Sequence, residues 1–275
     1  MNSRRRWNVP AAGHAGKRSV SVEIKSKIFD AHLHIIDPRF PLIPNQGYLP
    51  EPFTCRDYLD RLAGYSLAGG AVVSGSFQGF DQDYLCAALR ELGPTFVGVT
   101  QLPATVSDER ILELDRSGVR AVRFNLKRGG SEEVSQLERM ARRVYELAGW
   151  HVELYVDARD LADLAATLLR LPAVSIDHLG LSKAGFPLLL PLVERGVRVK
   201  ATGFGRVDFD VREALATLHG INPRALMFGT DLPSTRAPRP YRDEDLLLVY
   251  EALGDAGAAE VLYANAAAFY GRPDR

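Results

Sequence analysis

The chain has 275 residues, of which 46% are hydrophobic and 25% are charged, and its 34 basic side chains match its 34 acidic ones in number. These values are typical of a globular protein and exclude a disordered chain, a collagen, a coiled-coil rod and a small disulfide scaffold. The charge is unevenly distributed. Residues 1–27 hold seven basic side chains and one acidic one, a net +6 that leaves −6 for the remaining residues.

The basic segment at the start, residues 1–26, is predicted to be a flexible extension, because it shows no apolar periodicity. Its arginine run at 4–6 is similar to a twin-arginine export signal, but the apolar stretch of at least ~7 residues that such a signal needs is missing. A nucleic-acid-binding arm is the other functional interpretation. Since the rest of the chain is acidic and lacks a basic–aromatic patch, we expect no nucleic-acid partner.

No stretch approaches the ~18 apolar residues of a membrane-spanning helix, so we expect no membrane partner. The two cysteines, Cys55 and Cys86, lack the spacing of a metal site. We interpret them as reduced structural thiols, which favours a cytoplasmic protein.

From residue 27 onward, short β-rich runs alternate with longer helical patterns. Strand centres such as Val72-Val73 are apolar for several residues, as in parallel strands that are buried on both faces. The predicted strands are 27–34, 70–76, 95–102, 119–125, 150–156, 173–178, 197–202 and 225–231. The predicted helices include 54–68, 82–92, 131–149, 160–170, 186–195 and 209–219, and the acidic run at 243–245 indicates another helix start.

Eight strand–helix units over residues 27–275 match the size of one (β/α)₈ TIM barrel, the α/β fold that we predict. A doubly wound open sheet is the alternative. It would normally carry a glycine-rich phosphate-binding turn after its first strand, and the sequence has none. No proline- or serine-rich linker interrupts residues 27–275, so we predict a single domain.

Polar side chains gather where the predicted strands end, which is where barrel enzymes carry their chemistry. His32 and His34 lie at the end of the first strand, and residues i and i+2 of a strand point to the same face. His178 ends the sixth strand and Asp231 ends the eighth. We interpret three imidazoles and one carboxylate at a common rim as catalytic residues.

The motifs that end these strands together resemble the amidohydrolase superfamily, in order and from about residue 27 to the end. They are Phe29-Asp30-Ala31-His32-Leu33-His34, Ile176-Asp177-His178 and Phe228-Gly229-Thr230-Asp231-Leu232-Pro233. Within the superfamily, the chain is most similar to the 2-pyrone-4,6-dicarboxylate hydrolases, a family of lactonases of aromatic catabolism. The resemblance implies hydrolysis of a lactone that carries carboxylates, and it extends to sugar-lactone hydrolases.

The resemblance also implies a set of substrate-binding residues. Arginine suits this role because its planar guanidinium binds a carboxylate through two parallel hydrogen bonds, although each arginine could instead form a salt bridge with a neighbouring acid. The second arginine after the fourth strand maps onto residue 128, in a segment one residue shorter than the family pattern. The implied residues are Tyr48, Ser76, Arg123, Arg128, Tyr155 and Arg206.

The lactonases that the chain resembles work without metal, so we expect no cofactor. Metal-bound superfamily members take a ligand from the fifth strand, where this chain has Tyr155. If zinc or another divalent metal were bound, its ligands would be His32, His34, His178 and Asp231, since three protein ligands suffice for a catalytic zinc.

These residues lead to one mechanistic hypothesis. Asp231 acts as a general base on water, and the imidazoles of His32, His34 and His178 stabilise the oxyanion. The expected partner is a small anionic lactone, and a homo-oligomer remains an open option. The alternatives are a zinc-dependent hydrolase or decarboxylase of the same superfamily, a neutral sugar lactonase and, more remotely, a non-catalytic binding protein.

Overall fold

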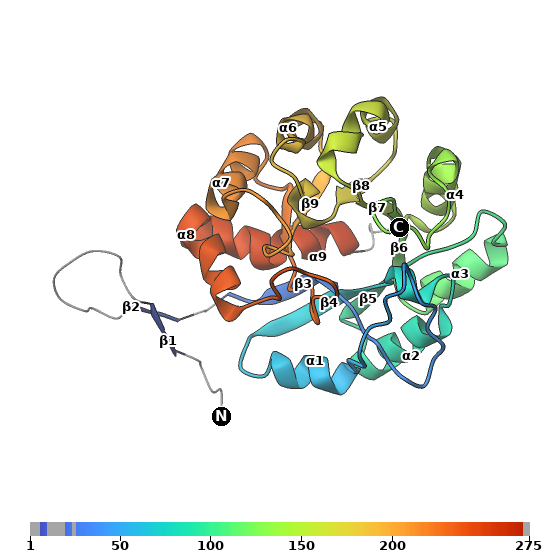
Figure 1. Cartoon of the computed structure of the whole chain (residues 1–275), viewed down its shortest axis with the longest axis horizontal. Coiled ribbons are helices and arrows are strands. Elements are labelled where there is room, and N and C mark those ends of the chain that lie inside the picture. The colour runs from blue at the N-terminus through green and yellow to red at the C-terminus, as the bar shows by residue number, and fades with distance from the viewer. Residues whose placement is uncertain (1–5, 10–19, 24–25, 272–275) are drawn as a thin grey trace.

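The computed structural model describes residues 6–9, 20–23 and 26–271 (Figure 1). Its main sheet contains eight parallel strands that neighbour one another in chain order. This arrangement confirms the predicted barrel. The strands are β3 (Ile28–Leu33), β4 (Leu67–Val73), β5 (Phe96–Thr100), β6 (Val119–Asn125), β7 (His151–Tyr155), β8 (Val174–Ile176), β9 (Arg198–Ala201) and β10 (Leu226–Phe228).

A helix follows each of these strands, and together the helices surround the sheet (Figure 1). None of the helices in the described residues is both long and apolar enough to cross a membrane. The helices are α1 (Cys55–Arg61), α2 (Asp83–Leu92), α3 (Asp108–Arg116), α4 (Leu137–Ala148), α5 (Leu161–Leu168), α6 (Phe186–Glu194), α7 (Val211–Ile221) and α8 (Asp243–Ala259), and a π-helical turn (Glu260–Ala264) then leads into α9 (Asn265–Tyr270).

Two predicted helices are shorter in the structure than in the sequence pattern. Helix α1 ends at Arg61 rather than at residue 68, and Gly64 just beyond it has φ +101°, a conformation that glycine adopts without steric cost. Helix α4 begins at Leu137 rather than at 131, because residues 131–133 are irregular and a 3₁₀ turn at Val134–Gln136 comes before it. The longer loop before α4 helps to form the site described below.

The extension also differs from its prediction. Its described parts form two short antiparallel strands, β1 (Arg6–Val9) and β2 (Val20–Glu23), where the sequence analysis expected no regular structure. The second strand reads Val-Ser-Val-Glu, an alternation with period two that indicates a strand. Because this alternation spans only four residues, the extension as a whole shows no clear strand pattern. Most of the arginine run, at 4 and 5, lies outside the described residues.

The core has two layers, one on each side of the sheet. On β4, Val72 packs toward the surrounding helices, whereas Ala71 and Val73 belong to the cluster inside the barrel. Helix α9 contributes to this inner cluster, since Tyr270 stacks on Phe29 with ring centroids 5.4 Å apart. Burial on both faces explains why the strand sequences are almost continuously apolar.

The barrel closes between its first and last strands through backbone bonds beyond the strand ends, here called the β3–β10 seam. The amide of Asp231 donates to the carbonyl of His32 at 2.8 Å, and the amide of His34 donates to the carbonyl of Leu232 at 2.8 Å. Three of the four residues predicted to be catalytic therefore contribute their own backbone to the closure of the fold.

Candidate active site

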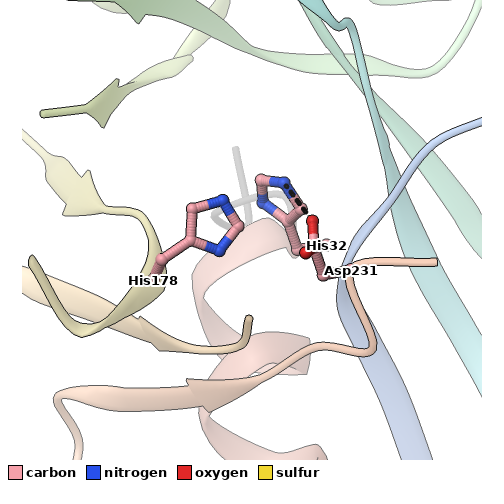
Figure 2. A group of neighbouring side chains, drawn as sticks. All are labelled: His32, His178 and Asp231. Carbon is pink, nitrogen blue, oxygen red and sulfur yellow. Dashed lines mark ion pairs between the residues drawn. The ribbon is translucent and has the colours of Figure 1, made fainter. Parts of the chain in front are cut away.

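The four residues predicted to be catalytic come together at the carboxyl ends of the strands. The Nε2 atoms of His32 and His34 lie 3.9 and 3.7 Å from Oδ1 of Asp231. The ring of His178, in the turn after β8, packs edge-on against that of His32 with centroids 4.8 Å apart. Figure 2 shows the two imidazoles beside each other and the Asp231 carboxylate next to His32.

Asp231 is almost fully buried, and its two carboxylate oxygens have different surroundings. Oδ2 accepts a hydrogen bond from Nε of Arg206 at 2.7 Å, whereas Oδ1 has no hydrogen-bond partner and faces the imidazoles. Burial alone would raise the pKa of Asp231, but the charge of Arg206 and the nearby imidazoles outweigh it and hold the pKa well below its usual range. The carboxylate is therefore ionised, with one oxygen available to accept a proton.

Asp30 anchors this corner of the site, a role that the sequence analysis did not assign to it. Its carboxylate accepts hydrogen bonds from the backbone amide and hydroxyl of Thr230 at 2.9 and 2.6 Å, and from the amide of His32 at 3.2 Å. Burial raises its pKa to about 6. Asp30 thus ties β3 to the segment that carries Asp231.

The imidazoles of His32 and His34 are each oriented by contacts of Nδ1. Nδ1 of His34 donates to the carbonyl of Val73 at 2.7 Å, which leaves its Nε2 facing Asp231. Nδ1 of His32 lies between Nζ of Lys200 at 3.3 Å and Oδ1 of Asp177 at 3.4 Å, so its Nε2 is the atom that faces Asp231. Burial lowers the pKa of His32 to about 3 and that of His178 well below its usual value, so both rings are neutral near pH 7.

A set of fully buried charges lies beneath His32, here called the floor network: Arg123, Glu153, Asp177 and Lys200. Lys200 forms an ion pair with Glu153 and lies 3.7 Å from Oδ1 of Asp177. Nε and Nη2 of Arg123 donate to Oδ2 of Asp177 at 3.2 and 2.8 Å. Every charge in the network has an opposite partner, as buried charges require.

Arg123, in β6, and Arg206, after β9, are thus both paired with buried acids. Arg123 is held by Asp177 and by the carbonyl of Ser74, and Arg206 is held by Asp231 and by the carbonyl of Thr235. The salt-bridge interpretation raised from the sequence therefore describes both contacts.

The predicted substrate-binding residues surround one cavity above this floor. The lining of this cavity includes Ser76, Arg123, Arg128, Tyr155 and Arg206 together with His34 and His178. The cavity continues outward into a cleft of about 300 Å³ that Arg128, Tyr155 and Arg206 also border. Tyr48 lies nearby, in the loop after β3.

Arg236 also lines the cavity, and the sequence analysis missed it. Its guanidinium lies over the ring of Tyr48, 4.7 Å from the ring centroid, and Nη2 donates to Oγ of Ser76 at 2.9 Å. The residue lies in an irregular loop five positions after Asp231, so a search restricted to strand ends does not reach it. Its positive φ of 56° is unusual for a residue other than glycine, and such residues are common at functional sites.

Comparison with known proteins places the chain in a family. Residues 29–272 match the amidohydrolase family model. The chain belongs to the amidohydrolase family. This amidohydrolase is 32% identical over 162 residues to a 2-pyrone-4,6-dicarboxylate hydrolase of Comamonas testosteroni, and the match covers 55% of this chain and about half, 51%, of that relative.

Two solved structures with provisional assignments as 2-pyrone-4,6-dicarboxylic acid hydrolases share the fold of this amidohydrolase. The Acinetobacter baumannii protein is 21% identical with a TM-score of 0.77, over 89% of this chain and 99% of that chain. The Pseudomonas putida protein is 27% identical with a TM-score of 0.74, over 91% of this chain and 98% of that chain.

The donor atoms of this amidohydrolase fit a divalent metal. Three buried atoms without hydrogen-bond partners belong to His32 (Nε2), His178 (Nδ1) and Asp231 (Oδ1), and these three residues can bring one ligand atom each to within 4.8 Å of the others. Imidazole nitrogens and a carboxylate oxygen are the usual zinc ligands. A second group with metal-like spacing, His32, Glu153 and Asp177, already surrounds the ammonium of Lys200.

Proposed function

We propose that this amidohydrolase hydrolyses a cyclic ester that carries carboxylate groups, such as 2-pyrone-4,6-dicarboxylate. The observation that carries the proposal is the ionised Asp231, whose unpaired Oδ1 faces three imidazoles below a cavity bordered by guanidinium groups. The similarity to the Comamonas testosteroni enzyme supports a lactone as the substrate class.

In the proposed reaction, Oδ1 of Asp231 accepts a proton from a water molecule while the water oxygen forms a bond to the lactone carbonyl carbon. The carbonyl oxygen becomes an oxyanion, which the imidazoles of His32 and His178 stabilise by hydrogen bonds. The bond between that carbon and the ring oxygen then breaks, and the proton on Asp231 passes to the leaving ring oxygen. Losing one oxyanion donor typically costs ~3–4 kcal/mol of transition-state stabilisation.

We propose a different part for His34 from the one that the sequence suggested. Its Nδ1 proton is held by the carbonyl of Val73, and its Nε2 lies 3.7 Å from Oδ1 of Asp231. An imidazole whose proton is held in this way accepts a proton at Nε2 rather than donating one to an oxyanion. We propose that it shares the proton of the attacking water with Asp231.

The substrate carboxylates are proposed to bind at the guanidinium groups of the cavity. Arg123 and Arg206 hold Asp177 and Asp231 and can use only their remaining N–H groups, whereas Arg128 forms no ion pair with any described residue. The hydroxyl groups of Ser76 and Tyr155 and the ring of Tyr48 are proposed to orient the substrate ring or the arginines around it.

A divalent metal, if bound, would be held by His32, His34, His178 and Asp231, and it would polarise the carbonyl and lower the pKa of a bound water. We propose that the reaction proceeds without one. Asp231 is the single carboxylate in this set, and its charge is already balanced by Arg206 at 2.7 Å, which weakens the attraction for a second cation.

An assay of purified protein tests the proposal. We expect ring opening of 2-pyrone-4,6-dicarboxylate, followed by absorbance, to be at least about 100-fold faster than hydrolysis of a neutral aldonolactone. That ratio corresponds to about 2.7 kcal/mol, within the range of one or two hydrogen bonds to charged groups. Preference for the neutral lactone would instead indicate a sugar lactonase. A stoichiometric metal whose chelation abolishes turnover would indicate the zinc-dependent alternative.

A further inference from the structure

The arginines around the cavity fall into two kinds. Arg123 and Arg206 form ion pairs with Asp177 and Asp231 at 2.8 and 2.7 Å, so each of these positive charges is neutralised inside the protein. Arg128 and Arg236, which line the same cavity, form no ion pair with any acid of residues 26–271.

The guanidinium of Arg236 is held in place by neutral groups alone. Nη1 and Nη2 donate to Oδ1 of Asn45 at 3.2 and 3.1 Å, and Nη2 donates to Oγ of Ser76 at 2.9 Å. The ring of Tyr48 packs under its face. These contacts fix the position of the charge without cancelling it.

Asn45 connects this arginine to its neighbour. Its Oδ1 accepts from Arg236, and its Nδ2 donates to the backbone carbonyl of Arg128 at 3.2 Å. The bond from Asn45 fixes the loop after β6 against the loop after β3, and the amide of Arg128 also donates to Oδ1 of Asn125 at 3.0 Å at the start of its own loop. Burial and the charge of Arg128 both lower the pKa of Arg236, as expected for two cations placed near each other without an anion.

We propose that Arg128 and Arg236 form a carboxylate-binding subsite at the mouth of the cavity, which selects substrates with a carboxylate remote from the ester. This inference rests on the proposed function for the identity of the substrate. Within it, Arg236 is a specificity-determining residue, and Asn45, Tyr48 and Ser76 position it. Two guanidinium groups on one carboxylate would relieve their mutual repulsion and supply several charge-assisted hydrogen bonds.

The test uses two planar aromatic acids as ligands, isophthalate with two carboxylates and benzoate with one. Calorimetry on the whole protein should show that Arg236→Gln weakens isophthalate binding by about 10- to 100-fold, the range for hydrogen bonds to charged groups. Benzoate binding should change by less than about threefold. Arg236→Lys, which keeps the charge but not the fork, should have an intermediate effect on isophthalate.

The matched control is Arg239→Gln, in the same loop. Arg239 is paired with Asp245 through bonds of 2.9 and 2.8 Å, so its removal takes the same charge from the loop but none from the subsite. The subsite would be overturned if Arg236→Gln and Arg239→Gln lost the same amount of isophthalate affinity. It would also be overturned if Arg236→Gln lost as much affinity for benzoate as for isophthalate. Thermal unfolding of each variant shows whether it is folded, and Arg236→Lys provides the comparison if Arg236→Gln is not.

Activity separates this inference from the proposed function. Selective loss of isophthalate binding in Arg236→Gln, in a protein that opens no lactone, would support the subsite and refute the proposed reaction. Lactone hydrolysis with the same KM in wild type and Arg236→Gln would support the reaction and overturn the subsite.

Discussion

Charges are arranged differently on the floor of the cavity and at its mouth. The floor here includes the floor network and the residues above it that are predicted to be catalytic: His32, His34, His178 and Asp231. On the floor, Asp177 and Asp231 each meet an arginine and Lys200 meets an acid, and none of these side chains is more than 7% exposed. At the mouth, the guanidinium of Arg236 bonds to neutral groups, and neither Arg236 nor Arg128 forms an ion pair with a described residue. A buried charge must be matched if the chain is to fold, whereas a charge reserved for a ligand must be left unmatched. In the proposed reaction, the floor serves both chemistry and stability, whereas the mouth serves substrate recognition.

The largest expected effect is on the floor, from Asp231→Asn. Asparagine tolerates the left-handed backbone of this position, where φ is +59°, so the fold should persist. Removing the general base should lower kcat by about 10³-fold, within the range of general-base catalysis. Lactone turnover and thermal unfolding measure the two effects. Asp255→Asn, at an exposed position on α8, is the control, and a near-wild-type rate in Asp231→Asn would show that the base is assigned wrongly.

A second change on the floor tests stability rather than chemistry. Lys200→Met leaves the buried Glu153 without its cation and should lower the free energy of unfolding by about 3–5 kcal/mol, the usual effect of breaking a buried pair. The double variant Lys200→Met/Glu153→Gln should recover part of this loss. Denaturant unfolding measures both, and a double variant less stable than the single one would contradict the pairing.

Acid should destabilise the floor through its neutral histidines. The unfolded chain protonates His178 below its ordinary pKa of 6.5, whereas the folded protein keeps it neutral, so its contribution to stability is complete above pH 6.5 and is lost as the pH falls. Between pH 7.5 and 5, wild type should lose about 2 kcal/mol more than His178→Gln. Equal losses in the two proteins would show that His178 is not held neutral. The contribution of Asp30 has the opposite sign and cancels in this comparison.

The smallest effect is expected at the mouth. Tyr48→Phe keeps a ring under Arg236 and should raise KM for the lactone less than threefold, whereas Tyr48→Ala should raise it about fivefold, in line with the ~0.5–1 kcal/mol of an exposed cation–π contact. If Tyr48→Phe raised KM as much as Tyr48→Ala, the hydroxyl group rather than the ring would make the important contact.

The sequence predicts the floor better than it predicts the mouth. His32, His178 and Asp231 end strands, and the topology of a barrel brings strand ends together whatever the loops do. Arg236 lies in an irregular loop whose path depends on contacts with Asn45 and Ser76, far away in the chain, so no local pattern marks it.

The pairing of the arginines could not be predicted for a related reason. Arg123 and Asp177 are 54 positions apart, and only the arrangement of β6 beside β7 and β8 shows that they meet. The sequence identifies both side chains as strand-end residues, but it does not show which of the four arginines already has an acid. Helix ends were also less predictable than strand ends, because single turns such as that at Gly64 decide them.

The β3–β10 seam has a consequence for how the protein reaches its active form. The bonds that close the barrel join His32 and His34 to Asp231 and Leu232, about two hundred residues later, and such long-range contacts form late in folding because closing a long loop costs chain entropy. A nascent chain cannot join these two segments until residue 232 has been synthesised. In refolding, recovery of activity should therefore coincide with the slowest structural phase, so that partly folded intermediates are inactive.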